Sequence, residues 1–100
     1  MRLTQQQRTS ILQATREAFG GGAQVWLFGS RARDDKRGGD IDLLVRPSAE
    51  EPEEVKLARK LRFLGLLERQ LGERRIDVVI ERSDDRRAIV KVAHDTGVQL

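Results

Sequence analysis

The chain has 100 residues, the length of one domain, and we expect residues 1–100 to form a single unit. It carries 19 Lys and Arg against 16 Asp and Glu, and its arginine-rich basic set suits a phosphate-bearing ligand. It has no cysteine, which excludes disulfides and thiolate metal sites, and no apolar run long enough to span a bilayer or serve as a signal peptide. We therefore expect a soluble, cytoplasmic protein.

The first half of the chain predicts one helix followed by two strands. Residues 4–19 place apolar side chains at helical spacing, and Thr4 with Gln7 fits a capping box. Residues 23–28 are short and rich in β-branched and aromatic side chains, which is typical of a buried strand. After a charged loop, residues 40–46 form a second apolar strand.

The longest predicted helix covers residues 49–71. Its leucines at helical spacing predict a core face made of Leu57, Leu61, Leu64, Leu67 and Leu71. Three further apolar residues lie off that face: Val55, Phe63 and Leu66. They are either ordinary surface side chains or a contact for a second copy or another protein.

The last part of the chain predicts a strand, a helix and a short edge strand. Residues 75–81 repeat the apolar strand pattern, and residues 83–85 provide an N-cap with an acidic first turn. The helix that they open directs Ile89, Val92 and Ala93 inward and ends near Gly97. The order of elements predicts an α/β (α+β) domain with a small mixed sheet of three to four strands covered by helices.

Two acids interrupt the second strand. Asp40 and Asp42 are two residues apart, so both project from the same face, with Cα atoms roughly 6.5–7 Å apart. Two adjacent carboxylates repel each other and need a positive partner. That partner is an Arg or Lys side chain, or Mg²⁺, which prefers oxygen ligands.

Asp77 interrupts the third strand in the same way. If this strand lies beside the second, Asp77 joins Asp40 and Asp42, and three carboxylates suit two metal ions about 3.5–4 Å apart. Asp77 could then accept a proton from an incoming hydroxyl. The alternative for each acid is an N-cap or a salt bridge at the end of a strand.

The turn between the first two strands begins with Gly29 and Ser30. Gly29 permits a close approach of the backbone to a ligand, and Ser30 offers a hydroxyl and an amide to a phosphate. Arg31 and Arg33 follow as candidate contacts to a triphosphate, and Gly39 gives the loop freedom to approach the nucleotide. The alternative is a solvated charged loop.

The combination of Gly29-Ser30, nine intervening residues, Asp40-Ile41-Asp42 and a third acid at Asp77 resembles the nucleotidyltransferase superfamily that includes DNA polymerase beta. The stretches "GSRAR" and "GGDIDLLV" are most similar to the minimal nucleotidyltransferases of the MntA antitoxin type. The resemblance extends over essentially the whole chain.

The resemblance implies a function and a role for each residue. Asp40, Asp42 and Asp77 would hold Mg²⁺, two ions in all, and Gly29 with Ser30 would hold the β- and γ-phosphates of a nucleoside triphosphate. The enzyme would transfer a nucleoside monophosphate, AMP from ATP, to a hydroxyl. Family members of the antitoxin type adenylylate a small helical partner of the HEPN class.

A second class of function stays open, namely a non-catalytic protein that neutralises a partner or holds nucleic acid through its basic face. The residues do not specify the nucleobase, the acceptor or the oligomeric state, and a homo-oligomer is compatible with them. His94, the single histidine, is expected to be a surface residue of the last helix and not a catalytic one.

Overall fold

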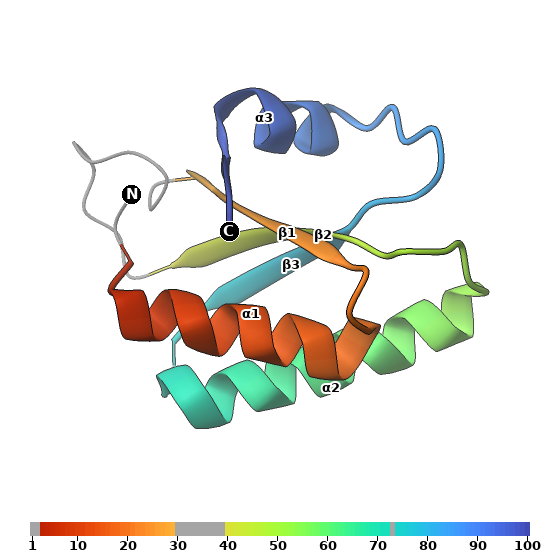
Figure 1. Cartoon of the computed structure of the whole chain (residues 1–100). Helices are drawn as coiled ribbons and strands as arrows, with labels where there is room; N and C mark the ends of the chain where they lie inside the picture. Colours follow the sequence, from red (N-terminus) through yellow and green to blue (C-terminus); the bar gives the residue numbers. More distant parts are fainter. Residues whose placement is uncertain (1–2, 30–39, 73) are drawn as a thin grey trace.

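The computed structural model describes residues 3–29, 40–72 and 74–100. Helices cover both faces of one sheet, with α1 and α2 on one side and α3 on the other (Figure 1). The elements in chain order are α1 (Gln5–Phe19), β1 (Gln24–Phe28), β2 (Ile41–Arg46), α2 (Glu53–Leu71), β3 (Ile76–Ile80), α3 (Ala88–Thr96) and β4 (Val98–Gln99). In the described part of the chain, no helix is both long and apolar enough to cross a bilayer.

The four strands form a mixed sheet in the order β3-β2-β1-β4. β1 is antiparallel to both of its neighbours, β2 and β4, and β2 is parallel to β3. The parallel pair follows from the connection through α2, since parallel neighbours need a long crossover. The predicted α+β class and the edge strand at the C-terminal end are both confirmed.

α1 begins where the sequence predicts. Thr4 Oγ1 accepts a hydrogen bond from Gln7 N at 3.0 Å, and Gln7 Oε1 accepts one from Thr4 N at 2.9 Å. This capping box satisfies two amides that the first turn of a helix leaves without partners. The helix ends at Gly20, whose φ of +95° lies in the left-handed region.

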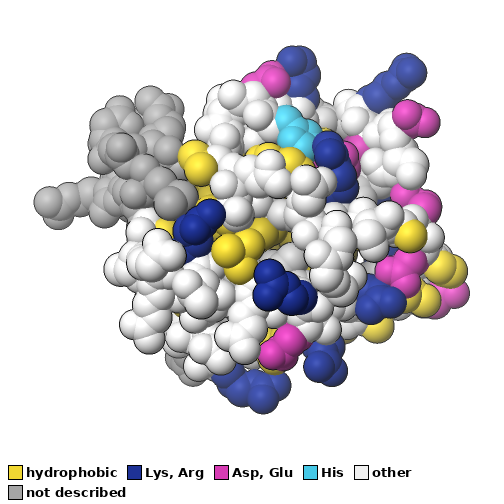
Figure 2. All heavy atoms as spheres, in the orientation of Figure 1, with side chains coloured by type: hydrophobic (Ala, Val, Ile, Leu, Met, Phe, Trp, Pro, Cys, Tyr) yellow, Lys and Arg dark blue, Asp and Glu magenta, His cyan; other side chains and the backbone are white. Residues whose placement is uncertain are grey.

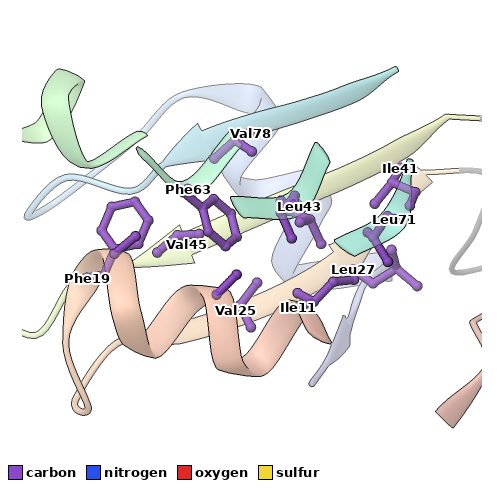
Figure 3. Close-up of a cluster of buried hydrophobic side chains, with 13 residues drawn as sticks. Ile11, Phe19, Val25, Leu27, Ile41, Leu43, Val45, Phe63, Leu71 and Val78 are labelled. Atoms are coloured by element: carbon purple, nitrogen blue, oxygen red, sulfur yellow. The ribbon is translucent and has the colours of Figure 1, made fainter. Parts of the chain in front are cut away.

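The main hydrophobic core lies between the sheet and the pair α1 and α2 (Figure 3). β2 contributes every second residue to it, through Ile41, Leu43 and Val45, all fully buried. Phe63 of α2 meets Phe19 of α1 edge to face, with ring centroids 5.4 Å apart. These contacts fix the two helices against one face of the sheet and leave the other face to α3.

The predicted core face of α2 is partly wrong. Phe63, expected off the face, is fully buried, whereas Leu57 and Leu61 are 57% and 60% exposed. Leu67 and Leu71 are buried as expected. Leucines occur on more than one side of this helix, so spacing alone does not identify the buried side, which the packing of Phe63 on α1 decides.

The start and the buried face of α3 also differ from expectation. The N-cap is Arg87, not residues 83–85, and Asp85 instead accepts from the backbone amide of Arg87 at 3.1 Å. Val90 is buried as Ala93 is, whereas Ile89 and Val92 are 41% and 48% exposed. The apolar residues of α3 spread over a wide arc opposite Lys91, His94 and Asp95, so their spacing does not show which part of that arc packs on the sheet.

A second, smaller core lies under α3. Trp26 and Phe28 of β1 and Leu44 of β2 pack there with Val90 and Ala93 of α3. Its members in β1 and β2 alternate with those of the main core, so they occupy the opposite face of the sheet. The candidate site lies on this second face.

Candidate active site

Two of the predicted acids lie side by side in the sheet. Asp42 of β2 and Asp77 of β3 are register partners in the parallel pair. Asp42 alternates with Ile41 and Leu43, which enter the main core, so its side chain belongs to the face that α3 covers. Asp77 alternates with buried Val78 in the same way, and the expectation that it neighbours the second strand is confirmed.

Asp40 lies one residue before β2 and is exposed. By strand alternation it belongs to the same face as Asp42, two residues later. The negative charge of Asp40 acts on Asp42, because repulsion between the two carboxylates is one of the causes that raise the pKa of the Asp42 carboxyl. Asp40 therefore stands at the edge of the site, beside the Asp42–Asp77 pair.

Asp42 is the electrostatic centre of the site. Burial raises the pKa of its carboxyl, and the negative charges of Asp77 and Asp40, with a side-chain hydrogen bond to Asp77, raise it further. Arg75 acts in the opposite direction on this pKa. The fold thus holds an anion where anions are unfavourable, a pattern that is more frequent at functional sites than elsewhere.

Arg75 is a site residue that the sequence analysis did not identify. Its Nε lies 3.5 Å from Asp77 Oδ2, and the two side chains are 73% and 52% exposed. The spacing in the sequence indicates this neighbour, because Arg75 precedes Asp77 by two residues and residues at that spacing in a strand project from the same face. At this exposure the ion pair is weak, and a more strongly bound cation could displace Arg75 from Asp77.

Gly29 packs directly on the Asp42 carboxylate. β1 and β2 pair Phe28 with Asp42, which brings the next residue, Gly29, against that side chain. A Cβ built on Gly29 would overlap Asp42 Oδ2, and its φ of +74° is one that other residues rarely adopt. Gly29 thus approaches a carboxylate of the site closely, and its predicted approach to a ligand stays a prediction.

The chemistry of the carboxylates suits a hard divalent cation such as Mg²⁺. In residues 3–29, 40–72 and 74–100, no three Asp, Glu or His side chains are gathered closely enough to enclose an ion. Asp42 and Asp77 are nevertheless register partners, and the raised pKa of Asp42 marks a site that a positive charge would stabilise. The residues therefore suit a metal ion in chemical type.

Four predicted nucleotide contacts lie outside the described residues, namely Ser30, Arg31, Arg33 and Gly39. Their roles in phosphate binding remain predictions. The described residues that flank them along the chain are Gly29 and Asp40.

His94 lies away from the acids, at the opposite ends of β2 and β3. Its Nε2 contacts Glu81 Oε1 at 2.5 Å and Arg46 Nη2 at 3.3 Å, and its ring meets Trp26 edge to face. Figure 2 shows the histidine beside a basic side chain on this face. These contacts tie α3 to the sheet.

Comparison with known proteins adds independent evidence. The family model of the nucleotidyltransferase domain matches residues 8–98, a range that contains the three acids and the Gly29-Ser30 turn. A search of curated proteins found no match. The match covers nearly the whole chain, and the mixed sheet with acids on neighbouring strands agrees with it. The chain therefore belongs to the nucleotidyltransferase domain family, within the DNA polymerase beta-like superfamily.

Proposed function

We propose that this nucleotidyltransferase domain transfers AMP from ATP to a hydroxyl of a partner protein, with Mg²⁺ as its cofactor. The observation that supports this most is the in-register pair of Asp42 and Asp77, with Asp40 beside it. Carboxylates that repel one another on a sheet face are suited to a divalent cation and a bound triphosphate.

Each residue of the site has a definite task in this reaction. Asp40 and Asp42 hold the divalent ions, which when bound supply the positive charge that balances the triphosphate. Gly29 with Ser30 holds the β- and γ-phosphates through backbone groups at the turn. Asp77 would complete the metal site beside the acceptor and take the proton of the acceptor hydroxyl.

The transfer itself follows a simple balance. The acceptor oxygen forms a bond to the α-phosphorus of ATP, and the bond from that phosphorus to the bridging oxygen of the β-phosphate breaks. Pyrophosphate leaves with the bonding electrons, and the hydroxyl proton passes to the Asp77 carboxylate. Such chemistry depends mainly on positioning and charge, so a domain with few functional side chains can perform it.

The proposed acceptor is a small helical protein of the HEPN class, and the proposed role is that of the antitoxin in a toxin–antitoxin pair. This rests on the similarity of "GSRAR" and "GGDIDLLV" to antitoxin-type nucleotidyltransferases. The rival function, binding through a basic face alone, has less support. Among the described residues, Figure 2 shows acidic side chains interspersed with the basic ones on the face it presents.

The direct test is label transfer. The chain is incubated with Mg²⁺, a HEPN-class partner and ATP labelled at the α-phosphate, and a parallel reaction contains ATP labelled at the γ-phosphate. We expect label on the partner from the α-position only, and loss of at least about a hundredfold in Asp42→Asn. Asp95→Asn is the matched control, because Asp95 forms an exposed ion pair with Lys91 on α3.

Two outcomes would contradict the proposal. Label transferred from the γ-position would indicate a kinase. Neutralisation of the partner by Asp42→Asn at the wild-type level, without any transfer, would favour the binding protein.

A further inference from the structure

One flank of α2 is exposed although it carries large apolar residues. Leu57 and Leu61 lie one helical turn apart, so they share that flank. The opposite flank faces α1, where Arg59 Nη1 donates to Ala18 O at 3.2 Å. The two leucines, each more than half exposed, therefore lie on the side of α2 that is turned away from α1.

A shallow groove of about 230 Å³ lies beside Leu57, between α2 and the end of β3. Leu57 and Ile80 are its apolar lining, and the other lining residues are four cations and one acid: Lys56, Lys60, Arg82, Arg87 and Glu53. Lys56 is paired with Glu53 at 3.0 Å, and Arg82 and Arg87 share Asp85 at 3.9 and 2.6 Å, so the positive excess is small and Lys60 contributes most of it. Leucines beside a basic rim form a more specific surface than scattered apolar residues.

We propose that this surface, made of Leu57, Lys60, Leu61, Ile80 and Arg82 and called here the leucine–lysine surface, docks an acidic amphipathic helix of a partner protein. The apolar side of that helix covers the two leucines, whose spacing of four residues matches a helical stripe. Its Glu and Asp side chains meet Lys60 and Arg82 at the rim.

A helix fits this surface better than an added strand. β3 is an edge strand of the sheet, but its Ile80 O already accepts a hydrogen bond from Arg87 Nη2 at 2.7 Å. Val78, at the centre of β3, is only 5% exposed. The backbone of this edge therefore offers little to an incoming strand, whereas the leucine side chains are open.

The charge of the surface also argues against a second copy of this chain as the occupant. A second copy would present this same surface, whose excess charge is positive, so it offers less complementary charge than an acidic helix does. The surface belongs to α2, across the sheet from the carboxylates, so docking goes beyond the proposed transfer and can be tested without it.

The probe is a synthetic helix of about five turns, with leucines at i, i+4 and i+7 and glutamates beside them. It is titrated into the isotope-labelled chain, and backbone amide shifts are followed by NMR. We expect shifts at residues 53–61 and 80–82, and binding at least about tenfold weaker in Leu61→Glu. Val92→Glu on α3 is the matched control, since Val92 is 48% exposed, and we expect it to bind as the wild type does.

A matched peptide with lysines in place of glutamates tests the role of charge, and we expect it to bind at least about tenfold more weakly than the acidic peptide. Asp42→Asn is expected to bind the acidic peptide normally, which separates docking from transfer. Equal binding of the two peptides, shifts confined to other residues, or no shifts at about 1 mM peptide would overturn the proposal. Self-association of the chain that Leu61→Glu removes would also overturn it, in favour of a second copy.

Discussion

Asp42 and Asp77 are register partners on the adjacent parallel strands β2 and β3, and the fold holds their carboxylates together. This arrangement opposes stability, because burial and like charge both disfavour the ionised form of Asp42. The cost is understandable if the pair serves a bound cation and a phosphate. Stability and activity should therefore respond in opposite directions when one charge is removed.

The first prediction concerns Asp42→Asn. Asn keeps the shape of the side chain and removes its charge, so we expect a Tm higher by roughly 2–5 °C at pH 7, together with loss of transfer. The pKa of Asp42 is raised in the folded state, so the wild type regains this stability as the pH falls through that pKa. The gain of the variant should therefore shrink as the pH falls through the raised pKa of Asp42, and it should be gone below about pH 4, where an unperturbed Asp is also protonated. A lower Tm for Asp42→Asn at pH 7 would show that the pair is stabilising.

The second prediction concerns Gly29→Ala. The added methyl group falls on Asp42 Oδ2 and the backbone has a φ of +74°, so we expect destabilisation of about 1–3 kcal/mol and loss of transfer. Gly65→Ala is the matched control, since nothing lies within 4 Å of its Cβ position in α2. Ala is the better helix former, so the control should be more stable than the wild type. Similar unfolding curves for wild type and Gly29→Ala would exclude the tight contact.

The third prediction separates the two faces of α2. Phe63→Ala removes a fully buried ring that packs on Phe19, and we expect a loss of about 3–5 kcal/mol. Leu61→Ala changes an exposed side chain and should cost less than about 0.5 kcal/mol. Urea unfolding followed by the fluorescence of the single tryptophan, Trp26, measures both. The reverse order of effects would mean that the buried side of α2 is the one suggested by its leucine spacing.

Sequence pattern predicted the neighbourhood of two acids and failed for part of the packing. Alternation predicts that Asp40 and Asp42 share a face, because a strand permits only two orientations of its side chains, and the register of β2 on β3 then brings Asp77 beside Asp42. A helix offers more orientations, and α2 carries leucines on several sides, so the burial of Phe63 depends on α1 and could not be predicted from α2 alone.

Contacts between distant segments account for what the sequence did not predict. Asp85 accepts a hydrogen bond from the backbone amide of Arg87 and forms an ion pair with the Arg87 guanidinium. It therefore stabilises a turn before α3 and does not cap that helix. The contact of Gly29 with Asp42 requires the register of β1 on β2, which no local pattern reveals. These features become visible only when the strands and loops are in place.

The fourth prediction concerns Glu50, which joins the loop after β2 to the loop after β3. It accepts hydrogen bonds from Ser83 N and Ser83 Oγ, each at 2.9 Å, and from Lys56 Nζ. The bond from the Ser83 amide is the largest cause that lowers the pKa of Glu50, to about 2. The ionised Glu50 carboxylate therefore contributes its full stabilisation of the fold above the unfolded pKa near 4.5, and this contribution is lost as the pH falls toward 2.

Thermal unfolding of Glu50→Gln checks this prediction. We expect a lower Tm than that of the wild type at pH 7 and a smaller difference as the pH approaches 2. Glu17→Gln on the exposed side of α1 is the control and should follow the wild type at both pH values. A difference that is independent of pH would show that the charge of Glu50 is not the stabilising feature.

The most direct measurement of the central claim is calorimetric titration of the chain with a non-hydrolysable ATP analogue, with and without Mg²⁺. We predict binding that requires Mg²⁺ and that is lost in Asp42→Asn and in Asp77→Asn, while Asp95→Asn binds normally. Binding of equal strength without Mg²⁺, or unchanged binding in both site variants, would contradict a metal-assisted nucleotide site at these carboxylates.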